Sequence, residues 1–169
     1  MILLLLLASL QSHADSLEVI GGSLTYHLMG EGSENFYNKL SPDGRLIANG
    51  LLGVQYTMED KAYYESLAVF TGNDSVGGQI GGVKASKGVK LGNVYLGFVV
   101  GAYEQDDNKF DKVGLIPFQI AKAGSTGIVP IIGGEVNYKI GLYRDMFMKI
   151  NNIITPVLTN TTLSLGFSY

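Results

Sequence analysis

The sequence predicts an all-β fold, an eight-stranded antiparallel transmembrane β-barrel. Three observations support this prediction. Apolar and polar residues alternate with a period of two in successive segments of about ten residues. The links between these segments alternate between long and short, as they do in outer-membrane barrels. The chain also carries 23 glycines among its 169 residues, which suit a narrow lumen and strongly twisted strands.

The chain opens with a short apolar run that ends in Ser12, His13 and Ala14, a small-x-small pattern typical of a cleavage site. We therefore interpret residues 1–14 as a signal peptide and residues 15–169 as an outer-membrane β-barrel. A membrane anchor is the alternative, but the run is shorter than the roughly 20 residues that a membrane helix needs. The sequence contains no cysteine, so neither disulfides nor a lipid-attachment cysteine is available.

The first predicted strand covers residues 18–29 and has two distinct faces. Its apolar face holds Ile20, Leu24, Tyr26 and Leu28, and its polar face holds Ser23, Thr25 and His27. The polar face is expected to line the lumen of the barrel. Seven further strands are predicted at residues 46–58, 62–71, 79–89, 93–103, 129–139, 146–154 and 161–169.

Two of the later strands indicate which side faces the membrane. In segment 129–139, one face holds Glu135, Asn137 and Lys139, and the other holds Ile132, Val136 and Tyr138. In the last strand, one face holds Leu163, Leu165, Phe167 and Tyr169. A soluble barrel such as a lipocalin would turn the apolar face inward, but only 16% of the residues are charged, too few to cover a solvated exterior. We therefore prefer the membrane barrel.

The predicted links fix the orientation of the barrel. The long ones are residues 30–45, 72–78, 104–128 and 155–160, and the short ones lie near 59–61, 90–92 and 140–145. Because short turns are periplasmic in outer-membrane barrels, both termini are expected on the periplasmic side. The predicted location is the outer membrane of a Gram-negative cell. The aromatic carboxyl-terminal residue resembles the signature by which the barrel assembly machinery recognises the last strand.

A histidine, a carboxylate and a hydroxyl are predicted at the outer rim. His27 lies near the outer end of the first strand, and Asp74 and Ser75 follow the top of the third. An imidazole takes a proton from an attacking hydroxyl while a carboxylate holds its tautomer, which is the inventory of base-assisted acyl transfer. The alternative is structural, since a lumen histidine is often a hydrogen-bonded filler and GNDSVGG has the composition of a turn.

At these residues the chain resembles the lipid A palmitoyltransferase family, the PagP-like outer-membrane acyltransferases. The family has an essential histidine late in its first strand, in a segment like LTYH at 24–27, and an Asp-Ser pair in the next outer loop. The resemblance implies His27 as the catalytic base, Asp74 as its electrostatic partner and Ser75 as a third essential hydroxyl. It also implies transfer of a palmitoyl-like chain from a phospholipid to lipid A, with no metal and no soluble cofactor.

Prolines interrupt the ladder between neighbouring strands because they lack an N–H group. Pro117, Pro130 and Pro156 lie where one such seam is expected, and the resemblance implies a lateral lipid gate there. The chain also departs from the family: Gly22 stands where the family has a proline, and the sequence has no tryptophan. Lys84 is a further difference, because a charge in the lower lumen would shorten or disfavour an acyl pocket.

Two functions follow from these observations. The first is an outer-membrane acyltransferase, and the second is a non-catalytic small barrel with a surface-binding or structural role. A lipid A deacylase is a weaker third hypothesis, since it needs a His-Ser pair near the C-terminus, where no histidine lies.

The isoelectric point near 5.3 and the net charge of −3 argue against nucleic acid as a partner. We expect the protein to be a monomer.

Overall fold

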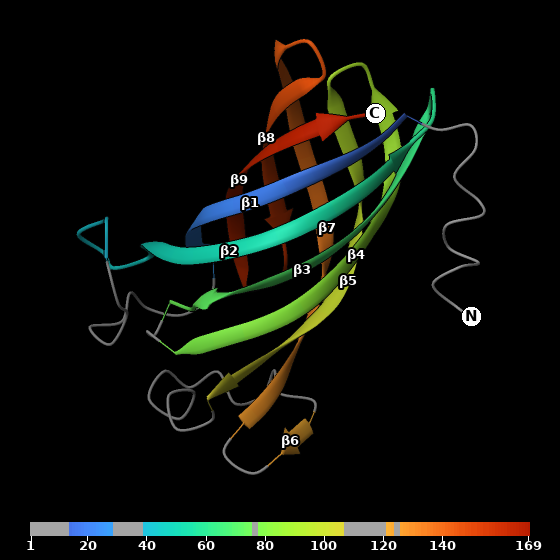
Figure 1. Ribbon diagram of the computed structural model, residues 1–169. Helices are drawn as coiled ribbons and strands as arrows, with labels where there is room; N and C mark the ends of the chain where they lie inside the picture. The colour runs from blue at the N-terminus through green and yellow to red at the C-terminus, as the bar shows by residue number, and fades with distance from the viewer. Residues whose placement is uncertain (1–13, 29–38, 76–77, 107–120, 124–125) are drawn as a thin grey trace.

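The computed structural model describes residues 14–28, 39–75, 78–106, 121–123 and 126–169, and the fold built from them is all-β (Figure 1). Nine strands occur among these residues. They are β1 (Ala14–His27), β2 (Leu46–Glu59), β3 (Tyr63–Asn73), β4 (Gln79–Leu91), β5 (Val94–Asp106), β6 (Ala121–Ala123), β7 (Thr126–Tyr143), β8 (Met146–Ile154) and β9 (Leu158–Ser168). Within the described ranges, no helix is long and apolar enough to cross a bilayer.

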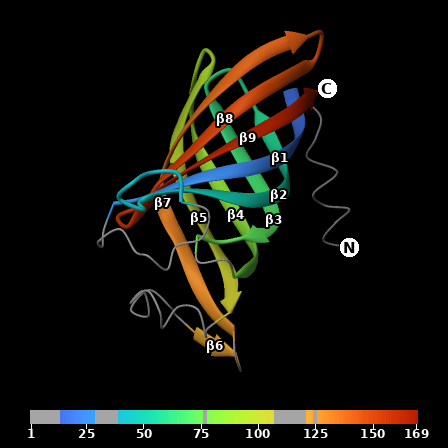
Figure 2. The ribbon, with the colours of Figure 1, turned by 90° about the vertical axis from the view of Figure 1, so that its left-hand side faces the viewer.

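Eight of the strands close into one antiparallel barrel, which confirms the predicted fold class. Their order is β5-β4-β3-β2-β1-β9-β8-β7, and β5 pairs with β7 to complete the ring. The sequence did not predict the ninth strand, β6, which pairs only with the first residues of β7. Figure 2 shows β6 at the far ends of β5 and β7, beyond the rest of the barrel. Closure leaves no sheet edge facing the surroundings along most of the wall.

The side chains follow the predicted inside-out arrangement. On β7, Glu135 and Asn137 are buried while Val136 and Tyr138 are exposed on the outer surface. On β9, Leu165 is 54% exposed, whereas its neighbour Ser164 is only 1% exposed. The outer surface is therefore apolar and the lumen polar, which is the arrangement of a membrane-spanning barrel and the reverse of a soluble one.

The first strand differs from its prediction at one residue. Ile20 was expected on the outer, apolar face, but it points into the lumen and is 2% exposed. A β-bulge between Gly21 and Ser23 is the cause, since the register of β1 shifts there against both neighbouring strands. Gly22 takes the extra position with a φ of 69°, a left-handed conformation that glycine adopts without a steric penalty. The bulge reverses the alternation, so Ile20 and Ser23 face the same side.

Several predicted boundaries also change. The link predicted as long at residues 155–160 spans only 155–157, because β9 begins at Leu158. The short link predicted at 140–145 is even shorter, since β7 continues to Tyr143. Residues 1–13 lie outside the described residues, so the signal peptide stays a prediction; β1 already begins at Ala14. The short links and the C-terminal end of β9 lie at one end of the barrel, which we call the short-turn end.

Candidate functional site

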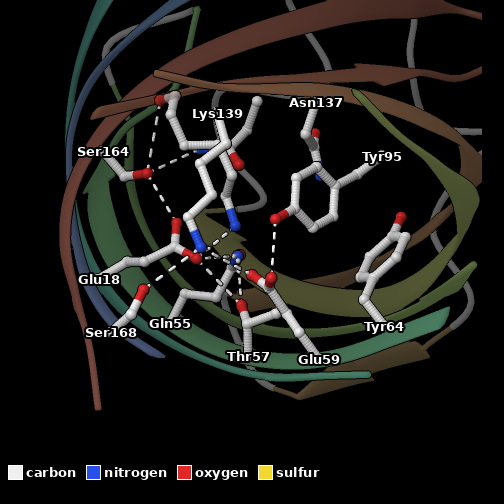
Figure 3. A network of polar contacts seen from close by, with 12 residues as sticks. Glu18, Gln55, Thr57, Glu59, Tyr64, Tyr95, Asn137, Lys139, Ser164 and Ser168 are labelled. Carbon is white, nitrogen blue, oxygen red and sulfur yellow. Dashed lines mark hydrogen bonds and ion pairs between the residues drawn. The ribbon is translucent and has the colours of Figure 1, made fainter. Parts of the chain in front are cut away.

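The lower lumen, toward the short-turn end, is filled by hydrogen-bonded polar side chains (Figure 3). Glu18 is at the centre of the first cluster and is fully buried. Its carboxylate forms an ion pair with Lys149 and accepts hydrogen bonds from Ser164 Oγ at 2.7 Å and Thr57 Oγ1 at 3.0 Å. Gln55 Nε2 donates a further bond at 3.3 Å. The residues come from β1, β2, β8 and β9, so the cluster ties these strands together.

A second cluster surrounds Glu59, near the short-turn end. Lys90 Nζ lies 2.8 Å from Glu59 Oε2, and Lys139 Nζ lies 3.1 Å from Glu59 Oε1. The Tyr95 hydroxyl also donates to Glu59 Oε2 at 2.8 Å. Tyr95 in turn packs edge-on against Tyr64, with ring centroids 5.3 Å apart. Glu59 and its three partners come from β2, β4, β5 and β7, and Tyr64 adds β3, so this cluster also joins several strands across the lumen.

The third cluster consists of Tyr64, Lys84 and Glu135, and its ion pair is the longest of the three clusters. Tyr64 donates to Glu135 Oε1 at 2.7 Å, and Lys84 Nζ lies 3.9 Å from Glu135 Oε2. That separation is an ion pair without a hydrogen bond, since N–H···O bonds end near 3.2 Å. Among the described residues, Glu135 Oε2 accepts no hydrogen bond. The sequence analysis expected Lys84 in the lower lumen, and the structure places it there, 6% exposed.

A cavity of about 450 Å³ lies above these clusters, in the half of the barrel toward the long links. Lys84 and Ile20 are among its lining residues, and Asp74 and Ser75 lie at its rim. Most of the wall is apolar. It includes Leu51, Phe70, Ile80, Tyr103, Val129, Ile131, Ile132, Ile153, Val157 and Leu158. The size falls within the range of pockets for small ligands, and the composition suits a hydrocarbon chain.

One polar part of the cavity wall comes from β1, β2 and β9 and is hydrogen-bonded across these strands. Asn49 Nδ2 and Asn160 Nδ2 each donate to Thr25 Oγ1 at 2.8 Å. Asn160 Nδ2 also lies 3.4 Å from Ser23 Oγ. Thr25 is thus held from both neighbouring strands, which fixes this side of the wall. The opposite side, built by β4, β5 and β7, is apolar except for Lys84 of β4.

The β7–β8 ladder ends beside the cavity. The last pair of that ladder is Gly134 with Ile154, while β7 continues for eight residues beyond it. At this point Gly133 lies so close to the carbonyl oxygen of Ile154 that an added Cβ would overlap it. Ile132, which lines the cavity, is also 57% exposed on the outer surface. The end of this ladder is therefore where the cavity wall comes nearest to lacking a hydrogen-bonded neighbour strand.

Two of the three prolines predicted as a lateral lipid gate lie in this part of the cavity wall. Pro130 on β7 and Pro156 in the β8–β9 turn both line the cavity. Pro130 cannot donate a backbone hydrogen bond, so the strand is weakened where it lacks β8 as a partner. Pro117 lies outside the described residues. The gate itself stays a prediction.

His27 is the last residue of β1 and is buried, 4% exposed. Its backbone N–H donates to the carbonyl oxygen of Arg45 at 3.1 Å. Although its side chain is on the lumen side, His27 is not among the described residues that line the cavity. Its predicted role as the base therefore has no support from the position of the cavity.

Asp74 and Ser75 follow β3, and both line the cavity. The Asp74 carboxylate accepts a hydrogen bond from the Gly78 N–H at 2.6 Å, and the Asp74 N–H donates to the Gly78 carbonyl at 2.9 Å. The carboxylate thus stabilises its own turn, as aspartates commonly do in turns. This arrangement is the structural alternative that the sequence left open for GNDSVGG.

The strand register keeps His27 and Asp74 apart. Ser23 pairs with Asn49, and Leu51 pairs with Gly72, so Asp74 is level with Ser23. His27 lies four residues further along β1, about 13 Å at the usual rise per residue, and β2 separates the two strands. Their Cα atoms are therefore roughly 16 Å apart along the wall. The structure brings Asp74 and Ser75 to one cavity and leaves His27 higher on the rim.

Several residues of the site were not singled out from the sequence. They are Glu18, Glu59, Lys149, Asn49 and Asn160. Glu59 and Lys149 fall on the lumen face of their strands, so the period of two could have found them. Glu18 lies two residues before Ile20, so the bulge at Gly22 reverses its side as well. Asn49 and Asn160 carried no such signal, because their importance depends on the cross-strand register that places both beside Thr25.

A closed ring of eight antiparallel strands with an apolar exterior and a polar lumen defines a β-barrel of the outer-membrane type. No protein-family model matches the sequence, and no curated protein matches it. Solved structures are similar to it. Ail, the attachment invasion locus protein of Yersinia pestis, has 10% identity and a TM-score of 0.46, over 94% of this chain and 100% of that chain. The N-terminal β-barrel domain of Pseudomonas aeruginosa OprF has 12% identity and a TM-score of 0.42, over 94% and 100%.

A designed transmembrane β-barrel is similar at the same level, with 12% identity, a TM-score of 0.42 and coverage of 94% of this chain and 98% of that chain. The class of protein is assigned from the strand order, the register and the two faces of the wall.

Proposed function

We propose that the protein is a non-catalytic outer-membrane β-barrel whose lumen binds the hydrocarbon chain of a lipid-like molecule. The observation that carries this proposal is the apolar cavity of about 450 Å³, which lies above the polar clusters and has Pro130 and Pro156 in its wall. Such a chain would enter from the membrane and not from water.

Burial of apolar surface supplies the driving force for a ligand that arrives from water, at about 0.8 kcal/mol for each methylene group. For a chain that arrives from the bilayer this term nearly vanishes, since the tail is already in hydrocarbon. Selective binding then depends on shape and on the few polar groups in the wall. This barrel offers both, because its apolar side faces a wall of fixed asparagine and threonine side chains.

The positions of His27 and Asp74 at the rim support lipid binding better than they support catalysis. A base and a nucleophile need hydrogen-bond reach of each other or of a shared substrate atom. The Cα atoms of His27 and Asp74 are about 16 Å apart along the wall, and the Asp74 carboxylate accepts a hydrogen bond from the Gly78 N–H. The cavity floor adds a second argument. An acyl donor with its ester at the rim would place its methyl end against Lys84 and Glu135, a poor environment for hydrocarbon.

A pair of tryptophan variants on β7 tests chain binding. Val129 is buried and lines the cavity, so Val129→Trp fills it; Val136 faces outward, so Val136→Trp is the matched control. Native mass spectrometry after release from detergent would detect a bound sixteen-carbon ligand. We expect wild type and Val136→Trp to retain it and Val129→Trp to lose it. The proposal is wrong if wild type retains no ligand, or if Val129→Trp retains as much as the control.

The acyltransferase is the second candidate, because Asp74, Ser75 and both prolines line one apolar cavity. Refolded barrel would be incubated with radiolabelled-palmitoyl phospholipid and lipid A, and the products separated by thin-layer chromatography. We expect no acylated lipid A from a barrel whose heat-modifiable gel mobility shows it to be folded. Product from wild type that Ser75→Ala or His27→Ala abolishes would replace our proposal with the transferase.

A further inference from the structure

We propose that the cavity takes a long-chain carboxylate, such as a free fatty acid, with its carboxylate bound by Lys84 at the floor and its tail toward the end of the β7–β8 ladder. This inference rests on the proposed binding of a hydrocarbon chain and adds the chemical class and the orientation of the ligand.

The lumen below the cavity carries an excess of positive charge. Among the described residues that form its ion pairs, four lysines are matched by three glutamates. Glu59 is shared by two of the lysines, and Glu18 is fully engaged by Lys149 and three uncharged donors. A buried cation without a close anion is costly, so one further carboxylate would be stabilised in this layer.

Lys84 is the lysine with the weakest pairing, and it alone of the four lines the cavity. Its ammonium group is 3.9 Å from Glu135 Oε2, beyond hydrogen-bond distance, whereas the Lys90 and Lys139 ammonium groups lie 2.8 and 3.1 Å from Glu59. An ammonium group has three donors. A ligand carboxylate that reached the floor would accept from donors that no described residue now engages at hydrogen-bond distance.

The rim has the opposite charge, which fixes the orientation of the ligand. Asp74 lines the cavity at the end far from Lys84, so a carboxylate placed there would be repelled. With the carboxylate on Lys84, the tail contacts Phe70, Val129 and Ile132 and continues between Pro130 and Pro156 toward the bilayer. A tail longer than the cavity then ends in lipid, which makes the site tolerant of chain length.

The test compares palmitate and hexadecanol, which share the chain and differ in the head, on the full barrel in nanodiscs. Titration of [1-13C]palmitate by NMR gives the affinity and the environment of the carboxylate. Lys84→Met should weaken palmitate by about ten- to hundredfold, the contribution of a charge-assisted hydrogen bond, and leave hexadecanol unchanged. Lys90→Met, which removes a lumen lysine that does not line the cavity, is the control; it should weaken palmitate far less than Lys84→Met does and leave hexadecanol unchanged.

Glu135→Gln provides a test in the opposite direction that does not depend on the folding of Lys84→Met. The glutamine still accepts from Tyr64, while Lys84 loses its competing carboxylate, so palmitate should bind more tightly. Equal affinities for palmitate and hexadecanol, with no effect of Glu135→Gln, would overturn the carboxylate site and leave chain binding intact. Binding of neither ligand to wild type would overturn both proposals.

Discussion

Removal of the Lys149 ammonium group tests whether the Glu18 cluster stabilises the barrel. Lys149→Met keeps most of the side-chain volume but leaves Glu18, which is fully buried, as a carboxylate without its cation. The three remaining donors, from Gln55, Thr57 and Ser164, are uncharged. They satisfy hydrogen bonds and do not neutralise the charge.

Breaking one side of a buried ion pair typically costs about 3–5 kcal/mol, because a buried charge is left uncompensated. The remaining hydrogen bonds place Lys149→Met toward the lower end of that range, at roughly 3 kcal/mol. With a denaturant slope of about 2 kcal/mol per molar urea, the unfolding midpoint should fall by roughly 1.5 M.

The double variant Glu18→Gln/Lys149→Met isolates the charge. The glutamine keeps an oxygen acceptor for Ser164 and Thr57, and the pair becomes neutral, so at least half of the lost stability should return. Unfolding of the barrel in lipid vesicles would be followed by far-UV circular dichroism and heat-modifiable gel mobility, since the chain has no tryptophan for fluorescence. A single variant within about 1 kcal/mol of wild type, or a double variant as unstable as the single, would refute the reasoning.

Three further predictions concern the bulge, the outer wall and a loop. Gly22→Ala should destabilise by about 1–2 kcal/mol because of its φ of 69°, while Gly21→Ala, at an open position, should have little effect in the same urea titration. Leu163→Arg, on the outer face midway along β9, should cost about 2–4 kcal/mol in lipid vesicles, and a loss below about 1 kcal/mol would argue against a lipid-facing wall. The hydrogen bond from Ser41 lowers the pKa of Asp43. The bond therefore contributes to stability above the ordinary carboxyl pKa, and this contribution is lost as the pH falls through the lowered pKa of Asp43. In an NMR titration, Ser41→Ala should return the pKa of Asp43 toward its ordinary value.

The sequence predicted the barrel well because its signal is local. Alternation with a period of two depends only on neighbouring residues, so the lumen positions of Glu135 and Asn137 followed directly. The same alternation assigned Ile20 to the wrong face of its strand, because it considers neighbouring residues alone. A bulge adds one residue and reverses every later position, and a Gly-Gly pair does not reveal by itself whether a strand continues straight through it.

The site was harder to predict because it depends on register. His27, Asp74 and Ser75 were placed at one rim from strand order and length, but their separation is set by which residues pair across β1, β2 and β3. A difference of four residues in register moves a side chain by about 13 Å. The ending of the β7–β8 ladder at Gly134, beside the cavity, is likewise a property of two strands together.

The three polar clusters also have a consequence for the permeability of the envelope. An ion that entered the lumen would meet Glu18, Glu59 and Glu135, each in contact with at least one lysine, and would have to separate these pairs to pass. We therefore expect the described part of the barrel to conduct ions poorly, in contrast to the water-filled lumen of a porin, and single-channel recording in a planar bilayer would check this.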